Sequence, residues 1–177
     1  MHTVTIEHLK YPNGKFEYGK SYSAGEIQSN INAIEELPSL LNKTAALFTA
    51  DLLKKSYRPE GWNAQQIIHH LADSHMNAFI RVKLTLTENN PTINPYNQDA
   101  WVEMEDVKLP ISTSLAIVEN IHKRWVTVLK AMTTADFKKT YYHPEYKKTF
   151  ALDEFVALYA WHGKQHLSHL ELILNLN

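Results

Sequence analysis

Apolar residues recur every three or four positions along four long stretches of the chain. That spacing is typical of amphipathic helices, in which one face packs against a core. In the first stretch the apolar positions run from Ile27 to Leu41, and the others begin near Asn63, Ser112 and Leu152. The pattern therefore predicts helices over about 25–41, 63–88, 112–132 and 152–175.

Residues near the predicted helix ends support these boundaries. Asn63 followed by Gln66 comes close to a capping box, in which two side chains bond the free N–H groups at a helix start. Ser112 is predicted to cap the third helix. Pro38 lies within the first helix, where a proline kinks the helix or marks a restart.

The remaining segments lack a helical period. Residues 1–24 are predicted to form an irregular arm that packs over the domain. Residues 89–110 contain three prolines and are predicted to form a long loop, a kind of segment that is commonly functional or disordered. Residues 141–150 are predicted to form a tight turn or a small hairpin. With no repeat and no linker, the chain is predicted to be one all-α domain over 1–177, a four-helix bundle with long connecting loops.

Composition and charge exclude several classes of function. The 177 residues are 44% hydrophobic and 21% charged, which predicts a compact globular domain. A net charge of −1 provides no field to attract nucleic acid or anionic lipid, so neither is expected as a partner. No stretch approaches the ~18 apolar residues of a membrane-spanning helix, and the start lacks the pattern of a secretory signal. A cytoplasmic location is therefore expected.

Cysteine is absent from the chain, while histidine is frequent. With no cysteine there is no disulfide, no thiolate metal site and no cysteine nucleophile. Any bound metal must therefore be held by His, Asp or Glu side chains. Ten histidines are many for this length, and their positions decide whether they form a site.

The run YAWHGKQHLSHL, residues 159–170, places three histidines on successive turns of the fourth predicted helix. At about 100° per residue, His166 and His169 lie at about 40° and about −20° from His162, within the apolar stripe. A buried imidazole nitrogen without a partner costs about 1–3 kcal/mol. Two histidines four residues apart suit a divalent metal, whereas one HxxxH pair alone more often bonds to neighbouring carbonyls.

A third ligand has to come from another helix, and the second predicted helix contains IIHHLADSHMN. His75 lies within its apolar face, His69 points away from that face, and His70 lies beyond its other edge. His70 belongs to a polar stripe at helical spacing, which consists of Asn63, Gln66, His70, Asp73, Ser74, Asn77 and Arg81. Such a stripe is either a solvated surface, the commoner case, or the lining of an internal polar cavity. Periodicity alone does not choose between His70 and His75.

Other catalytic motifs are missing. The residues between His162 and His166 are GKQ, so there is no HExxH glutamate to act as the base of a zinc peptidase. There is no GxSxG elbow and no glycine-rich phosphate loop. Gly163 lies within a predicted helix at a cost of about 1 kcal/mol relative to alanine, which indicates either a close approach by another backbone or a ligand, or drift at an exposed site.

Several segments resemble a known family: GWNAQQIIHHLADSHMNAFIRVKLTLTE, NPYNQDAW and YAWHGKQHLSHL, together with YPNGK near the start. In this order and spacing they are similar to the YfiT-like branch of the DinB superfamily, four-helix-bundle proteins assigned as metal-dependent hydrolases. The resemblance implies that His70, His162 and His166 bind the metal, zinc or nickel, with positions left open to water. It implies that His169 is a neighbour of this site and that the protein is a homodimer that does not bind DNA.

Members close to YfiT resemble bacillithiol S-transferases, which join a low-molecular-weight thiol to an electrophile. The resemblance thus implies a metal-dependent enzyme with small-molecule thiol and electrophile substrates, and metal-activated water would make the same site a hydrolase. Asp73, Asn77 and Arg81 are the candidates to orient substrate.

Tyr96 and Trp101 lie in the long loop, either near the mouth of the site or anchoring the loop on the bundle. Two further hypotheses remain. One is a non-catalytic stress protein whose metal has a closed shell of four ligands that includes His75 or His169. The other is a bundle whose core histidines bind no metal.

Overall fold

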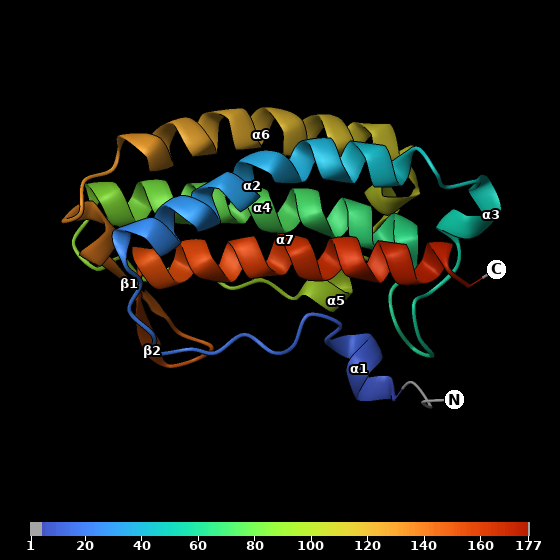
Figure 1. The fold of residues 1–177 in the computed structure, drawn as a ribbon, viewed down its shortest axis with the longest axis horizontal. Coiled ribbons are helices and arrows are strands. Elements are labelled where there is room, and N and C mark those ends of the chain that lie inside the picture. The colour runs from blue at the N-terminus through green and yellow to red at the C-terminus, as the bar shows by residue number, and fades with distance from the viewer. Residues whose placement is uncertain (1–4, 177) are drawn as a thin grey trace.

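The computed structural model describes residues 5–176 and has four long helices packed side by side (Figure 1). These are α2 (Ala24–Ala45), α4 (Ala64–Thr87), α6 (Ile111–Ala131) and α7 (Leu152–Leu174). The predicted four-helix bundle is confirmed. The shorter elements are α1 (Ile6–Lys10), α3 (Ala50–Leu53), α5 (Gln98–Trp101), the 3₁₀ helices η1 (Glu105–Lys108) and η2 (Asp136–Lys138), and strands β1 (Thr140–His143) and β2 (Lys148–Ala151). None of the helices described is long and apolar enough to cross a membrane.

The order of the helices around the bundle differs from their order in the chain. α2 packs against α6 and α7, and α4 packs against the same two helices, so α2 and α4 lie diagonally opposite. Figure 1 shows that α2 and α7 run in one direction and that α4 and α6 run in the other. Because α4 and α6 are neighbours that run the same way, the chain must return along the bundle between them. Residues 88–110 make this return and are called the crossover below.

The crossover covers the polar stripe of α4. Gln66 Nε2 donates to Val102 O, Gln65 Nε2 donates to Val107 O, and an Arg81 nitrogen donates to Asn94 O. The crossover also contains α5 and η1, two short helices that the prediction of a long loop did not include. The polar stripe is therefore not a fully solvated surface, since His70 and Ser74 are buried and its other residues are partly buried.

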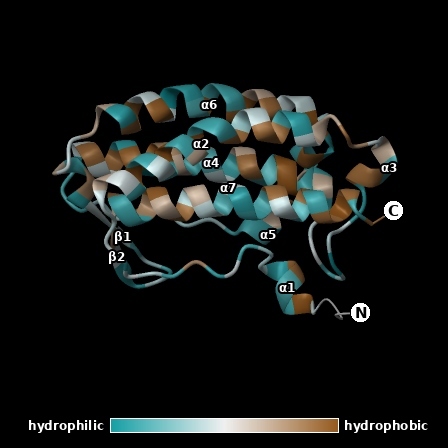
Figure 2. Cartoon of the chain, in the orientation of Figure 1, coloured by the Kyte–Doolittle hydropathy of each residue, from teal (hydrophilic) through white to brown (hydrophobic). Residues whose placement is uncertain are grey.

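The core follows the apolar stripes of the four long helices. Trp125, Phe155 and Leu41 are among the side chains that are almost completely buried, and hydrophilic residues occupy the other helix faces (Figure 2). Gly163 of α7 is buried, and a Cβ at this position would lie 2.7 Å from Leu37 Cδ2. Gly163 is therefore not at an exposed site, and the group that approaches it is the Leu37 side chain of α2, not another backbone or a ligand.

Helix starts agree with the sequence in α4 but not in α6. Asn63 and Gln66 form the expected capping box. Ser112, predicted to cap α6, makes no capping hydrogen bond, because the helix begins at Ile111 with Pro110 in the N-cap position. Proline is well suited to a helix start, since the missing N–H would have no partner inside the helix there. α2 continues without interruption through Pro38, so this proline does not mark a restart.

The predicted hairpin is present as antiparallel strands β1 and β2. Its first strand also contacts the crossover, because Tyr142 N donates to Pro91 O and Ile93 N donates to Tyr142 O. The hairpin and the start of the crossover thus form one layer at the end of the bundle, where α4 ends and α7 begins (Figure 1).

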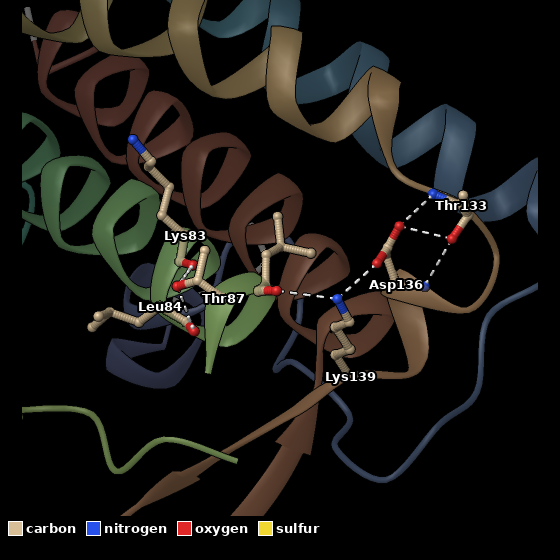
Figure 3. A network of polar contacts seen from close by, with 7 residues as sticks. Lys83, Leu84, Thr87, Thr133, Asp136 and Lys139 are labelled. Atoms are coloured by element: carbon tan, nitrogen blue, oxygen red, sulfur yellow. Dashed lines mark hydrogen bonds and ion pairs between the residues drawn. The ribbon is translucent and has the colours of Figure 1, made fainter. Parts of the chain in front are cut away.

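A polar network connects the segment after α6 to the end of α4 (Figure 3). Lys139 Nζ donates to Leu86 O at 3.1 Å and lies 3.0 Å from Asp136 Oδ1. Asp136 in turn accepts hydrogen bonds from the amide and the hydroxyl of Thr133. Exposed ion pairs contribute little stability. The network holds Lys139, which directly precedes β1, against the end of α4.

The N-terminal arm packs over α7, as expected. Trp161 Nε1 donates to Gly14 O, and Asn13 Nδ2 donates to Ser168 Oγ. The arm is not wholly irregular, since it includes α1, which Thr5 caps. Residues 1–4 of the predicted arm, like residue 177, lie outside the described residues.

Candidate metal centre

Three histidines from two helices meet inside the bundle. His70 of α4 and His162 and His166 of α7 each offer a ring nitrogen, and these nitrogens all lie within 4.8 Å of one another. His70 Nε2 is 3.2 Å from His162 Nε2. Two nitrogens bound to one ion at about 2.1 Å, in octahedral or tetrahedral geometry, are about 3.0–3.4 Å apart. The spacing of these residues therefore fits a metal ion, and it brings together the three predicted ligands.

Burial keeps the three rings neutral. It lowers the pKa of His70 and of His166 well below the usual value, and neighbouring histidines lower both further. Burial lowers the pKa of His162 to about 4. A neutral imidazole has one nitrogen with a free lone pair, which is the form that binds metals. The cluster that the described residues form here contains no carboxylate.

The hydrogen bonds behind His162 determine which of its nitrogens is free. His162 Nδ1 lies 3.2 Å from His75 Nε2, His75 Nδ1 lies 2.7 Å from His122 Nε2, and His122 Nδ1 lies 2.7 Å from Ile34 O. A carbonyl only accepts, so His122 Nδ1 carries the proton and its Nε2 accepts. The same logic then puts a proton on Nδ1 of His75 and of His162. His162 Nε2, which faces His70, is left free.

This chain of histidines, called the His75–His122 relay below, depends on a proline. In a helix the carbonyl of residue 34 would normally accept from the N–H of residue 38, but Pro38 has none. Ile34 O is therefore available to His122, which reaches it from α6. The role of Pro38 in α2 is thus to expose a backbone acceptor in the core.

A second, shorter chain supports His166. His169 Nε2 lies 3.1 Å from Lys10 O, so this nitrogen donates and His169 Nδ1 accepts. His169 Nδ1 lies 3.4 Å from His166 Nδ1, which leaves His166 Nε2 free. The ring of Tyr57 stacks on His169 at 4.1 Å. His75 and His169 both face the outer nitrogens of the predicted ligands, so neither is placed as a fourth ligand.

His69 belongs to a different part of the structure. The sequence predicted that it points away from the apolar face, yet it is buried, with its Nδ1 2.7 Å from Ser114 Oγ and its Nε2 3.1 Å from Leu109 O. These bonds attach α4 to the end of the crossover and the first turn of α6.

A cavity of about 200 Å³ reaches one of the three histidines, His162. Its lining includes His162 and Tyr159 from α7, Ser74 and Arg81 from α4, and His143 from β1. It reaches the surface beside two exposed tyrosines, Tyr18 of the arm and Tyr146 of the hairpin.

The substrate-orienting candidates are placed differently relative to this cavity. Arg81 lines it, whereas Asp73 and Asn77 are not among its lining residues. Asn77 Nδ2 donates to Asp73 O within α4. Burial, followed by the charge of Asp106, raises the pKa of Asp73 to about 6.

The two aromatic candidates of the crossover have separate roles. Tyr96 lines the cavity, while Trp101 does not and packs against Tyr96 with ring centroids 4.3 Å apart. Tyr96 is thus at the site, whereas Trp101 packs against Tyr96 within the crossover, and its role as an anchor on the bundle stays a prediction.

Sequence reasoning missed several residues near the centre. The ring of Trp62 lies 4.6 Å from that of His70 and 6.2 Å from that of His166. Tyr159 follows the apolar period of α7, so the sequence indicates a packing residue. His143 lies in the hairpin, and no periodic pattern indicates where the hairpin packs. Of these residues only Trp62 could have been placed near the start of α4 from the sequence, because it directly precedes the capping residue Asn63.

Comparison with known proteins agrees with this architecture. Residues 33–170 match the family described as the DinB superfamily. The chain belongs to the DinB superfamily. It is 45% identical over 161 residues to an Oceanobacillus iheyensis protein named "Putative metal-dependent hydrolase", covering 91% of this chain and 93% of that protein. A Bacillus cereus protein of the same name is 44% identical over 162 residues, covering 92% and 93%.

A solved DinB-like structure has the same fold. YfiT from Bacillus subtilis superposes with a TM-score of 0.91 at 39% identity, covering 94% of this chain and 95% of YfiT. It is described as a probable metal-dependent hydrolase with an unusual four-helix bundle topology. This DinB protein therefore has relatives named as metal-dependent hydrolases and a histidine cluster able to hold a metal. Which metal it prefers stays a prediction.

Proposed function

We propose that this DinB protein is a metal-dependent enzyme in which His70, His162 and His166 hold a divalent ion, zinc or nickel, that activates a low-molecular-weight thiol for transfer to an electrophile. The supporting observation is that three neutral imidazoles converge at the spacing of metal ligands beside a cavity that His162 also lines. The relatives' names support a metal-dependent reaction.

A divalent ion in this setting lowers the pKa of a bound thiol or water and so supplies a nucleophile near neutral pH. The protein's part is to present neutral nitrogens and to hold their rings in place through the His75–His122 relay and His169. In the transfer a sulfur–carbon bond forms, the electrophile's leaving group departs with its electron pair, and the thiol proton passes to solvent. A thiol suits a cluster without a carboxylate base, because its pKa of about 8.5 is already near neutrality.

Hydrolysis is a second candidate, and a specific observation favours it. Asp73 follows His70 by three residues on α4, so the two side chains share a helix face. With a pKa raised to about 6 by burial, its carboxylate is ionised at neutral pH and able to accept a proton from water. The names of the relatives agree with this candidate too.

Metal uptake tests the common basis of both candidates. After reconstitution with zinc or nickel, the purified protein is expected to retain about one equivalent of metal per chain. His166→Ala should lose the metal while keeping the helical circular dichroism signal. His8→Ala, at an exposed histidine of α1, is the matched control and should keep the metal. Less than one equivalent in the wild-type protein would contradict the proposal.

A paired assay then separates the two reactions. Metal-loaded protein is offered a small thiol with an electrophilic dye, and separately a panel of esters and amides. Metal-dependent conjugation without hydrolysis supports thiol transfer, and the reverse supports the hydrolase. Absence of both reactions in protein that holds its metal would contradict an enzymatic role and favour a structural one.

A further inference from the structure

Arg81 has a guanidinium group without an anionic partner. One of its terminal nitrogens donates to Asn94 O at 3.0 Å, but its Nε is buried and has no hydrogen-bond partner. Among the described residues, no carboxylate oxygen lies within 4.0 Å of its nitrogens. A buried donor that lacks an acceptor is unfavourable, so a ligand that supplies an acceptor to Arg81 would be bound favourably.

A second unpartnered nitrogen belongs to a residue that lines the same cavity. His143 of β1 lines the cavity, is only 7% exposed, and has a buried Nδ1 without a hydrogen-bond partner. Burial lowers the pKa of His143, and the charge of Arg81 lowers it further, as expected for two groups that are close together. The negative charge of Glu145, an exposed residue that also lines the cavity, acts in the other direction and raises the pKa of His143.

The rest of the lining is mainly aromatic. Tyr96, Tyr141, Phe155 and Tyr159 supply flat walls, and His162 connects the cavity to the candidate metal centre. A cavity of 150 Å³ is enough for benzene, so this cavity of about 200 Å³ has room for roughly eight non-hydrogen atoms. Its occupant is therefore a small molecule with an apolar body.

We propose that this cavity binds a substrate carrying a carboxylate, which accepts hydrogen bonds from the Arg81 guanidinium and from His143 in the tautomer with its proton on Nδ1, while the aromatic walls hold an apolar body. A carboxylate is favoured over a phosphate dianion because one guanidinium matches a single negative charge, and because the planar fork of arginine pairs with planar carboxylates. The assignment of this ligand as the substrate rests on the proposed function. The carboxylate subsite itself does not require the metal.

Side-chain NMR of metal-free protein tests the subsite directly. The chain has three arginines, Arg58, Arg81 and Arg124, so the Nε–H region of a ¹H–¹⁵N spectrum is simple. Benzoate and benzamide are used as probes, because they differ in charge but hardly in shape. Benzoate is expected to shift the Arg81 signal and to bind at least about tenfold more tightly than benzamide, as charge-assisted hydrogen bonds are the stronger kind.

Variants of two arginines complete the test. Arg81→Met should abolish the preference for benzoate, and Arg81→Lys, which keeps the charge without the planar fork, should reduce it. Arg124→Met is the matched control, because Arg124 is an exposed arginine that stacks on the ring of Phe79 and is not among the lining residues; it should leave the preference intact. If the Arg81 variants do not fold, the wild-type shift and probe preference still decide the outcome.

Equal affinity for the two probes, or a preference that survives in Arg81→Met, would overturn the subsite. Repeating the titration with zinc-loaded protein separates this failure from failure of the proposed function. A preference that appears only with zinc and persists in Arg81→Met means that the carboxylate binds the ion, which contradicts the subsite alone. An Arg81-dependent preference in a protein that takes up no metal supports the subsite and contradicts the proposed function.

Discussion

At His162, the ring nitrogen that faces away from the centre is hydrogen-bonded to another buried histidine. Such partners of metal ligands orient the ring and fix its protonated nitrogen, and losing one typically costs 10–100-fold in metal affinity. In this protein the partner is itself held in place by His122, which binds the carbonyl that Pro38 leaves free. The arrangement of the centre therefore depends on a residue of α2 that lies far from it in sequence.

Substitution of His75 tests the relay. His75→Leu leaves His162 Nδ1 without an acceptor and should weaken zinc binding by about 10–100-fold. His75→Gln keeps one acceptor and one donor in the same place, so it should restore most of the affinity. Zinc dissociation constants from competition with a chelator provide the measurement.

A purely packing role for His75 predicts a different result. In that case His75→Leu and His75→Gln would change the free energy of unfolding without separating in zinc affinity. The nitrogen chemical shifts of His162 provide an independent check, because only loss of the relay changes which of its nitrogens carries the proton.

The sequence predicted the positions of some histidines of the candidate metal centre and not of others. Spacing alone placed His162 and His166 on one face of one helix. It left His70 and His75 as alternatives, and the resemblance to the DinB superfamily was needed to prefer His70. The relay was beyond reach, because the free carbonyl of Ile34 matters only once α6 brings His122 against α2.

Among the elements, α2 and α7 are held unusually close at Gly163. A Cβ there would lie 2.7 Å from Leu37 Cδ2 and 3.2 Å from Cδ1. Gly163→Ala should therefore destabilise the protein by about 1 kcal/mol, since overpacking costs about 1–3 kcal/mol and alanine regains about 1 kcal/mol of helix propensity. In a Leu37→Ala background the clash is gone, and the same substitution should be stabilising. Urea denaturation of all four proteins gives the coupling energy.

Gly25 provides the control for that cycle. It lies in the first turn of α2, and nothing lies within 4 Å of a Cβ added there. Gly25→Ala should leave stability unchanged or raise it by up to about 1 kcal/mol, whether or not Leu37 is present. Additive behaviour of Gly163→Ala with Leu37→Ala would mean that the helices separate easily and that the close contact is not a constraint.

Periodicity found the four long helices to within a few residues of their ends, because each buries a continuous apolar stripe. It could not find α1, α3, α5 or the 3₁₀ helices, which are too short to show a period. It also gave no information on the diagonal placement of α2 and α4. Periodicity also could not decide whether the polar stripe of α4 is solvated. The crossover covers that stripe, and its position is not encoded in the period of α4.

At the scale of the whole molecule, the buried histidines make stability depend on pH. Burial lowers the pKa of His70, His75, His122, His162 and His166 below the ordinary value of 6.5. Below pH 6.5 the unfolded chain takes up protons that the folded protein does not, so stability is fully present above that pH and is lost as pH falls toward about 4. Each such histidine contributes up to about 1.4 kcal/mol per pH unit.

Urea unfolding of the metal-free protein at pH 7 and pH 5 measures this loss. We expect a clearly lower free energy of unfolding at pH 5. Asp73 acts in the opposite direction, since its raised pKa adds stability as pH falls through about 6. It is one group against these five histidines and against His69, His143 and His169, whose pKa burial also lowers. Equal stability at the two pH values would show that the histidines are charged or solvated in the folded protein.

The two ligand-bearing helices come from distant parts of the chain. His70 and His162 are separated by 92 positions, yet their facing nitrogens are 3.2 Å apart. An ion held between them, as proposed above, would act as a reversible cross-link that closes a very long loop and limits the freedom of the unfolded chain, much as a disulfide does in a protein that has cysteines. The lifetime of the folded protein against proteases would then depend on the supply of the ion, and metal starvation would remove the molecule as well as the proposed activity.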